Sequence, residues 1–194
     1  KKKEMIFHSR SRTKTVYFVY SGEVMLYNLT KHGNRKVIFI LGKGQLLNQS
    51  IVSKKPNALF CEAVCPVKVI EIAEEQFLQL MEQSHALTRA VLREYERNLW
   101  RMGHQLKNTT GNMQMERKIA AKLWKLGRDF GVDTEDGVMI DIDLTITLMA
   151  DLVGAPRENV SRACKVLTDR GLIRYGNKRF ILTDSDGLAE FYKM

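Results

Sequence analysis

Residues 145–170 read TITLMADLVGAPRENVSRACKVLTDR, which has the pattern of two short helices joined by a tight turn. Two helices that cross steeply need a small residue where they approach, a residue that tolerates positive φ in the turn, and a branched apolar residue that fixes the second helix. Ala150, Gly154 and Val160 supply these features in that order. The hydroxyl of Thr145 can cap the first helix by accepting a hydrogen bond from a backbone N–H. The segment therefore predicts a helix-turn-helix.

The second of these helices has an apolar face and a polar face. Val160, Cys164 and Leu167 recur at i, i+4 and i+7, so we expect them to face inward. The opposite stripe has side chains that can read the major groove, because Arg donates a pair of hydrogen bonds to guanine, Glu accepts one from cytosine, and Ser bonds a base or a phosphate. The predicted base-reading residues are Arg157, Glu158, Ser161 and Arg162.

A hairpin with basic residues near its tip is predicted at residues 172–182. Beside a helix-turn-helix, such a wing can contact the DNA backbone. The predicted phosphate-contacting residues are Thr145, Lys165, Lys178 and Arg179. The helix-turn-helix, its polar stripe and the wing together predict a protein that binds double-stranded DNA at specific sequences.

Residues 15–72 combine short apolar runs with turn residues, which predicts strands. Glycines separate these runs at intervals of about eleven residues, as is typical of a β-sandwich, roll or barrel. The last two strands, at residues 59–64 and 68–72, are expected to form a pair.

From residue 74 to about 107 the apolar spacing becomes helical, and the sequence NTTGN at 108–112 is expected to form a hinge. The stripe on this long helix is narrow, which is typical of a helix that pairs with a symmetry mate, although such a stripe can also pack onto its own domain. The predicted dimer-helix residues are Leu87, Val91, Tyr95, Leu99, Met102 and Leu106. Beyond the hinge we expect a helix at 115–130 and a half-buried strand at 137–144.

The chain has 194 residues and a formal net charge of +9. All of that excess lies in residues 1–115, whereas residues 116–194 hold equal numbers of acidic and basic side chains. Within the second stretch the acids gather at 129–151 and the bases at 157–179, and a local basic stripe suits a phosphate-binding surface. With 3 Cys and no apolar run of about 18 residues, the sequence predicts a soluble, cytoplasmic protein without a membrane partner.

The sequence contains no nucleophile elbow, P-loop or paired-carboxylate arrangement, so we predict no catalytic residues and no enzyme activity. The 4 histidines show no paired ligand spacing, so we predict no metal site, and no cofactor is identified with certainty. Cys61 and Cys65 are expected to share one face of a strand, and Cys164 is expected to belong to the core.

The sequence resembles the Crp–Fnr family of bacterial transcription regulators over nearly all of its length. Residues 19–24 (VYSGEV) resemble the family's sensor-domain strand pair, Gly33 its hairpin glycine, and residues 42–45 (GKGQ) the lead-in to its ligand cassette. Residues 157–162 (RENVSR) closely match the recognition-helix motif, and their Glu, Ser and Arg are similar to the oxygen-responsive branch, whose half-sites contain a TTGA-like element. The resemblance implies a homodimer that binds a palindrome, RNA polymerase as a partner if the protein is an activator, and a family helix and strand missing before Lys1.

The resemblance also implies an effector pocket, but with departures from the cyclic-nucleotide branch. That branch has a Gly-Glu pair and an Arg-Ser pair that bind ribose and phosphate, and the matching residues here are Asn48, Gln49, Ala58 and Leu59. Without the Arg, a buried phosphate has no positive partner, so we predict that cyclic AMP is not the effector. Such a pocket suits a neutral or weakly polar effector, or none. The predicted effector-pocket residues are Asn48, Gln49, Ala58, Leu59, Leu99 and Gly103.

The predicted fold is α+β and has three parts. They are an N-terminal β-roll sensor domain of the double-stranded β-helix or jelly-roll type (1–81), a long dimerisation helix with a hinge (82–112), and a C-terminal winged helix-turn-helix domain (113–194). We expect a dimeric DNA-binding transcription regulator whose effector is unknown. Two alternatives stay open: a small-molecule binding protein whose neutral winged domain acts through protein contacts, and a thiol or haem redox sensor that also binds DNA.

Overall fold

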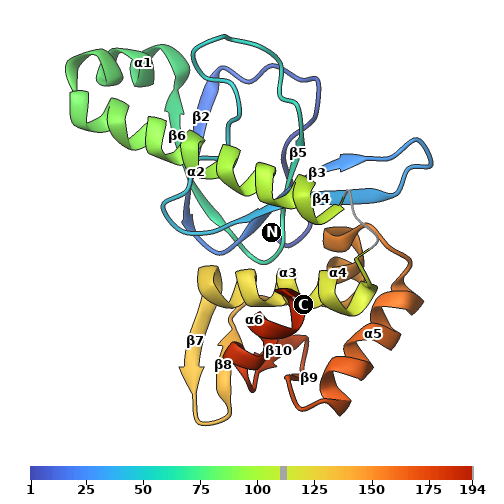
Figure 1. Cartoon of the computed structure of the whole chain (residues 1–194). Coiled ribbons are helices and arrows are strands. Elements are labelled where there is room, and N and C mark those ends of the chain that lie inside the picture. Colours follow the sequence, from blue (N-terminus) through green and yellow to red (C-terminus); the bar gives the residue numbers. More distant parts are fainter. Residues whose placement is uncertain (110–112, 194) are drawn as a thin grey trace. The chain divides into compact units, whose positions relative to one another are not determined.

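The computed structural model describes residues 1–109 and 113–193, and the chain divides into two compact units (Figure 1). The first unit extends to Lys107 and the second begins at Asn108. The first contains two antiparallel sheets and two helices, and the second contains four helices and one sheet, counted over the described residues. The predicted α+β class is therefore confirmed.

The predicted hinge at residues 108–112 is only partly described. Helix α2 (His85–Thr109) includes the first two of its residues, so these are helical and the hinge was predicted to start too early. Residues 110–112 lie outside the described residues, as does the side chain of Leu106. The three-part division at 81/82 and 112/113 stays a prediction.

Two antiparallel sheets form the body of the first unit. One has the strand order β1-β5-β3-β4 and the other consists of β2 and β6. The strands are β1 (Met5–Phe7), β2 (Thr15–Ser21), β3 (Val24–Leu29), β4 (Arg35–Leu41), β5 (Phe60–Ala63) and β6 (Lys68–Ala73). Strand β1 was not predicted, because three residues next to a lysine run carry too little apolar pattern to stand out from the sequence.

Two connections between the sheets meet at Gly22. The chain passes from β2 to β3 at this residue, and it passes from β5 to β6 through residues 64–67. Gly22 has φ +81°, and a Cβ placed on it would lie 2.5 Å from the carbonyl oxygen of Pro66, so only glycine fits. Because consecutive strands switch sheets here, the predicted pairing of 59–64 with 68–72 is wrong: β5 pairs with β1 and β3, whereas β6 pairs with β2.

Two apolar clusters stabilise the first unit. The first lies within the strands and has buried residues such as Leu26, Phe39 and Cys61. The second attaches helices α1 (Glu74–Gln83) and α2 to the strands and consists of buried Val16, Leu46, Ile51, Phe77 and Val91. The predicted helical region from 74 to 107 is interrupted at Ser84, whose extended backbone (φ −128°, ψ 98°) ends α1.

A four-stranded sheet and four helices form the second unit. The elements are α3 (Met115–Phe130), β7 (Gly131–Thr134), β8 (Gly137–Ile140), α4 (Ile146–Val153), α5 (Arg157–Asp169), β9 (Ile173–Gly176), β10 (Arg179–Leu182) and α6 (Ser185–Lys193). The strand order is β7-β8-β10-β9, with every pair antiparallel. Helix α3 buries one face and packs against α4, α5 and α6.

The predicted strand at 137–144 is shorter than expected, since β8 ends at Ile140. It pairs with β7, which was not predicted because all of its residues are exposed and its sequence therefore has no apolar alternation. Helix α6 was also not predicted.

The turn between α4 and α5 has the geometry that the sequence predicts. Gly154 is left-handed, with φ 72° and ψ 46°, and its N–H donates to the carbonyl oxygen of Ala150 at 2.7 Å. The N–H of Ala155 donates to the same oxygen at 3.2 Å, and the hydroxyl oxygen of Thr145 accepts from the N–H of Leu148 at 3.1 Å. The helix-turn-helix prediction is therefore confirmed in its cap and in its turn.

We expect Gly154→Ala to lower the free energy of unfolding by about 1–2 kcal/mol, because a Cβ destabilises left-handed backbone. Gly154→Asn should lower the free energy of unfolding by less than Gly154→Ala does, since asparagine adopts this conformation more readily than alanine. Urea unfolding of the whole chain measures both. As a control, Gly103→Ala in α2 meets open space and should be neutral or stabilising. Equal stability of Gly154→Ala and the natural chain would contradict the role of this turn.

Candidate nucleic-acid interface

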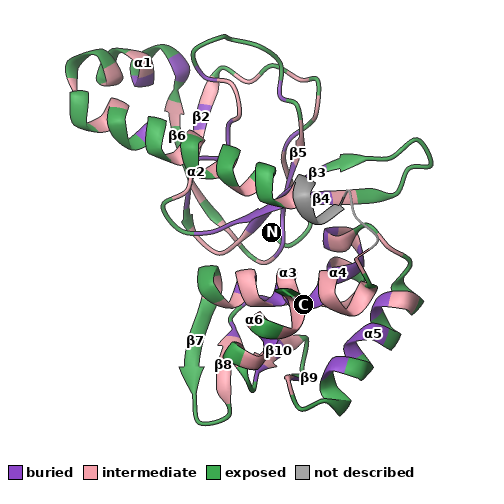
Figure 2. Cartoon of the chain, in the orientation of Figure 1, coloured by how far each residue is buried: buried purple, intermediate pink, exposed green. Residues whose placement is uncertain are grey.

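Helix α5 has a buried face and an exposed face (Figure 2). Val160, Cys164 and Leu167 are buried, as predicted, and Ala163 joins them. The other face is open to solvent and presents Arg157, Glu158, Ser161, Arg162 and Lys165. The sequence therefore predicted correctly which side of this helix is exposed.

The guanidinium of Arg162 is already oriented on the exposed face. It donates a hydrogen bond of 2.6 Å to Oδ1 of Asn159, which lies one turn earlier on α5. A guanidinium has five N–H donors, so this bond leaves donors for an external acceptor. Asn159 was not among the predicted site residues, and its i,i+3 spacing from Arg162 was the signal that could have identified it.

The wing is the hairpin of β9 and β10. Its strands pair Gly176 with Arg179, so Asn177 and Lys178 form a two-residue turn, and both have positive φ (50° and 62°). This is the geometry of a tight type I′ hairpin turn, whose twist matches that of the strands. Lys178 is consequently exposed at the tip.

Two arginines of the wing form ion pairs with acids of the neighbouring β7–β8 hairpin. Arg179, a predicted phosphate contact, pairs with Asp141, and Arg174 pairs with Asp136. The sequence showed acidic and basic stretches but not that they meet, because the strand register that joins them was unknown. Both pairs lie at solvent-exposed positions, so a phosphate can compete for the guanidinium groups.

The other predicted phosphate contacts are placed differently. Lys165 lies on the exposed face of α5. Thr145 is half-buried, and its oxygen already accepts the capping bond from Leu148, so only its O–H proton remains for a phosphate oxygen. The predicted residues on α5 and at the wing tip are thus exposed, whereas Thr145 and Arg179 are already engaged within the unit.

The predicted dimer-helix residues differ in how far the first unit covers them. Leu87, Val91 and Tyr95 pack into the second apolar cluster, whereas Leu99 and Met102 are exposed, by 71% and 44%. At about 100° per residue, the six residues fall within a sector of about 120° of the helix, so the difference in exposure arises along the helix and not around it. Their pairing with a second copy stays a prediction. Large apolar side chains that α2 exposes are Leu92, Leu99, Trp100 and Met102.

The inner face of α2 makes polar contacts with the strands and loops of the first unit. The hydroxyl of Tyr95 donates to the carbonyl oxygen of Asn48 at 3.4 Å, and Nε2 of Gln105 donates to that of Ile38 at 2.8 Å. Nε2 of Gln45 reaches Oε1 of Glu94 at 3.3 Å. The helix therefore faces the cassette segment, residues 44–51, along the same side that buries Val91.

The predicted effector-pocket residues differ in burial and in their hydrogen bonds, and their common lining stays a prediction. Asn48 is buried, and its amide is used within the fold, accepting from the N–H of Tyr17 at 2.7 Å and donating to the carbonyl oxygen of Thr15 at 2.9 Å. Leu59 is half-buried, and Ala58, Leu99 and Gly103 are exposed.

Two amide side chains, one in residues 44–51 and one in α2, each have a buried oxygen without a hydrogen-bond donor among the described residues. They are Oε1 of Gln49 and Oδ1 of Asn98. A buried acceptor without a donor destabilises the protein by about 1–3 kcal/mol. Asn98 was not predicted, although its i+3 spacing from Tyr95 on the inner face of α2 was a usable signal.

The cysteines are separated in the structure. Cys61 is buried in β5, but this strand ends at Ala63, so the prediction that Cys65 shares its face is wrong. The thiol of Cys65 donates to Oε2 of Glu23 at 2.9 Å. Burial raises the pKa of the Cys61 thiol and raises that of Cys164 to about 11, which makes both poor nucleophiles at neutral pH. Across residues 1–109 and 113–193, no three metal-ligating side chains gather at one point.

No described helix combines the length and apolar character that a bilayer crossing requires. A two-sheet unit with a long helix, followed by a winged helix-turn-helix with an exposed polar recognition face, defines the class of two-domain DNA-binding regulators. Residues 1–84 match the family model for the cyclic nucleotide-binding domain, and residues 117–191 match the Crp-like helix-turn-helix domain. The chain belongs to the Crp–Fnr family of bacterial transcription regulators.

Similar proteins carry the names of transcriptional regulators rather than enzymes. A CRP-like cAMP-activated global transcriptional regulator of Mycobacterium tuberculosis is 25% identical over 90% of this chain and 78% of its own length. A global nitrogen regulator of Nostoc is 25% identical over 90% of this chain and 79% of its own length. The solved structure of FixK2 from Bradyrhizobium japonicum has the same fold, with a TM-score of 0.84 at 20% identity over 98% of this chain and 93% of that one.

Proposed function

We propose that this protein is a dimeric regulator that binds palindromic DNA with TTGA-like half-sites through α5, under the control of an effector other than cyclic AMP. The observation that carries the proposal is the exposed face of Glu158, Ser161 and Arg162 on a helix whose other face is buried. In helix-turn-helix dimers the two recognition helices enter major grooves about 34 Å apart, one duplex turn, which requires a two-fold symmetric site.

The roles of the side chains follow from their chemistry. Arg162 would donate its remaining N–H groups to O6 and N7 of the guanine of TTGA, and Glu158 would accept from N4 of a cytosine on the complementary strand. Ser161 would bond a base or a phosphate. Arg157 would read a base beside Glu158, and Lys165 and Lys178 would contact phosphates and supply affinity without sequence preference.

The proposed effector is a neutral or weakly polar molecule that has hydrogen-bond donors and no phosphate. At the four positions that match the family's nucleotide-binding residues, this chain has no carboxylate and no guanidinium, and the Asn48 amide is used within the fold. The oxygens of Gln49 and Asn98 are acceptors in need of donors, and they belong to two segments that touch through Tyr95. The relative from Mycobacterium tuberculosis is cAMP-activated by name, so the exclusion of cyclic AMP rests on these residues and not on family membership.

Cyclic AMP is therefore expected to leave the melting temperature of the protein unchanged. If a site of about 10 μM affinity existed, about 1 mM ligand would stabilise the folded state by about 2.7 kcal/mol, which is a rise of about 5–10 °C for a chain of this size. Thermal unfolding with and without cyclic AMP measures this directly. A rise of several degrees would show that a phosphate is held without the expected arginine, and would contradict the proposal.

The proposed dimer contact is the exposed apolar row of α2. Leu92, Leu99 and Met102 lie at spacings of seven and three, which is the seam of a two-stranded coiled coil. Leu99→Asp would place two charges opposite each other in this seam, so we expect the protein to become monomeric in sedimentation velocity. Val52→Asp, at a similarly exposed apolar position in a loop, should keep the mass of the natural protein. A dimer that survives Leu99→Asp would contradict the proposed seam.

Arg162→Ala is expected to weaken binding to a TTGA palindrome by about 1–3 kcal/mol, roughly 5- to 150-fold, and to relax the preference at one base pair. Fluorescence anisotropy with the palindrome and with duplexes changed at each position measures both effects.

Lys178→Ala serves as the matched comparison, because it removes one exposed positive charge from the wing and not from the recognition face. It should weaken binding to all duplexes alike and reduce the salt slope by about 0.9. If Arg162→Ala also weakened all duplexes alike, Arg162 would be a phosphate contact. If the natural chain did not bind any duplex, a winged domain that acts through protein contacts would be favoured.

A further inference from the structure

We propose that Asp136 and Asp141 occupy the guanidinium groups of Arg174 and Arg179 as internal substitutes for DNA phosphate, and that they thereby raise the ratio of specific to non-specific DNA binding. The inference rests on the proposed DNA binding by α5 and the wing. It assigns a function to the acidic β7–β8 hairpin, which has no role in the base contacts.

The sheet itself brings the paired groups together. Strands β8 and β10 are antiparallel, with Met139 opposite Ile181. Counting two residues outward along each chain places Asp141 opposite Arg179, and these side chains form an ion pair. The two residues thus lie close to each other where β10 begins and just beyond the end of β8.

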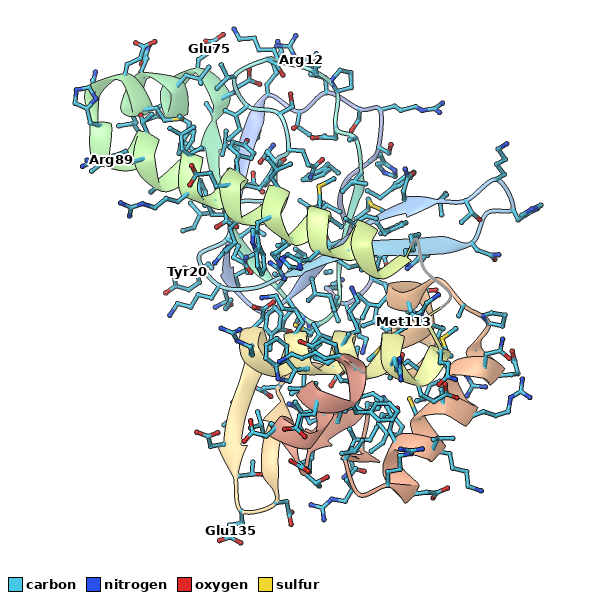
Figure 3. The ribbon with its side chains drawn as sticks, in the orientation of Figure 1. Arg12, Tyr20, Glu75, Arg89, Met113 and Glu135 are labelled. Carbon is cyan, nitrogen blue, oxygen red and sulfur yellow. The ribbon has the colours of Figure 1, made fainter. Side chains whose placement is uncertain are left out.

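The second pair lies at the other end of the hairpin. Asp136 belongs to the turn between β7 and β8, and it pairs with Arg174 on β9. Glu135, next to it at the tip of the hairpin, points away from the unit (Figure 3). The hairpin therefore directs one acid of its turn at the wing and leaves its neighbour in solvent.

A carboxylate and a phosphate use the same donors of a guanidinium, since both accept hydrogen bonds from its planar fork of N–H groups. Arg179 and Asp141 have side chains exposed by 35% and 56%, so water screens their ion pair and it contributes little to stability. Exchange of the carboxylate for a DNA phosphate therefore requires little free energy once the wing is held against the duplex. When the wing is not held there, each arginine is paired with a carboxylate and adds little net positive charge.

This arrangement affects the two modes of binding unequally. Non-specific binding derives almost entirely from phosphate neutralisation. Arginines that are paired with carboxylates therefore lower the affinity for non-specific DNA. Specific binding also gains from the base contacts of α5, which hold the wing in place while the carboxylates are exchanged. The balance of acids and bases in residues 116–194 is consistent with a unit that limits its attraction to arbitrary DNA.

The test compares Asp141→Asn with Asp133→Asn in the full chain. Both changes remove one negative charge from the same hairpin, but Asp133 forms no ion pair within the described residues. Fluorescence anisotropy with a random duplex and with a TTGA palindrome, at several salt concentrations, gives the affinities and the salt slopes. We expect Asp141→Asn to increase affinity for the random duplex about 3- to 10-fold and to steepen its salt slope by up to about 0.9. The palindrome should gain less, so the specificity ratio falls.

The control should change the random-duplex affinity by less than about 2-fold, because Asp133 holds no guanidinium among the described residues and its neutralisation therefore releases no phosphate-binding group. If Asp133→Asn and Asp141→Asn had equal effects, the general field of the hairpin would be responsible and the inference would be overturned. In an Arg179→Gln background the effect of Asp141→Asn should disappear, and its persistence would also overturn the inference. A natural chain that shows no preference for the palindrome would refute the proposed function, and the inference with it.

Discussion

Burial of one face of α5 is the constraint on which the candidate interface depends. Val160 and Leu167 are fully enclosed, and α5 packs on α3, whose own buried residues include Ile119 and Leu123. The rotation of α5 about its axis is therefore fixed by apolar packing, and the polar residues between these positions must face outward. A shift of the buried face by one residue would turn the helix by about 100° and bury charged side chains. The free-energy penalty for burying an unpaired charge is larger than the gain from a surface contact. Packing thus orders the recognition face before any ligand is present.

Much of the second unit could be predicted from sequence because its information is local. The cap at Thr145, the left-handed Gly154 and the spacing of Val160, Cys164 and Leu167 each depend on neighbours within a few residues. The wrong prediction concerned strand pairing, which joins residues that are distant in the sequence. The pairing of β5 and β6 required knowledge that the chain changes sheets around Gly22 and Pro66, and no spacing in the sequence encodes that crossing.

The same distinction explains the site residues that sequence reasoning missed. The ion pair of Asp141 with Arg179 joins residues 38 positions apart through a strand register, and only the folded sheet reveals it. The sequence also does not show which part of the α2 row is covered, because that depends on where the strands lie. The sequence thus indicated which residues carry chemistry more reliably than which residues meet.

Helix α2 is the element in which the proposed effector response and the proposed dimer contact are joined. Asn98, with its buried oxygen, and Leu99, with its exposed side chain, are consecutive residues and so lie about 100° apart around one helix. A donor that binds Asn98 acts on the rotation of the same rigid segment that presents Leu99. No longer path through the protein is required to connect the two, because a helix transmits rotation along its whole length. On the proposed function, an effector would therefore act by changing how two copies of α2 pair.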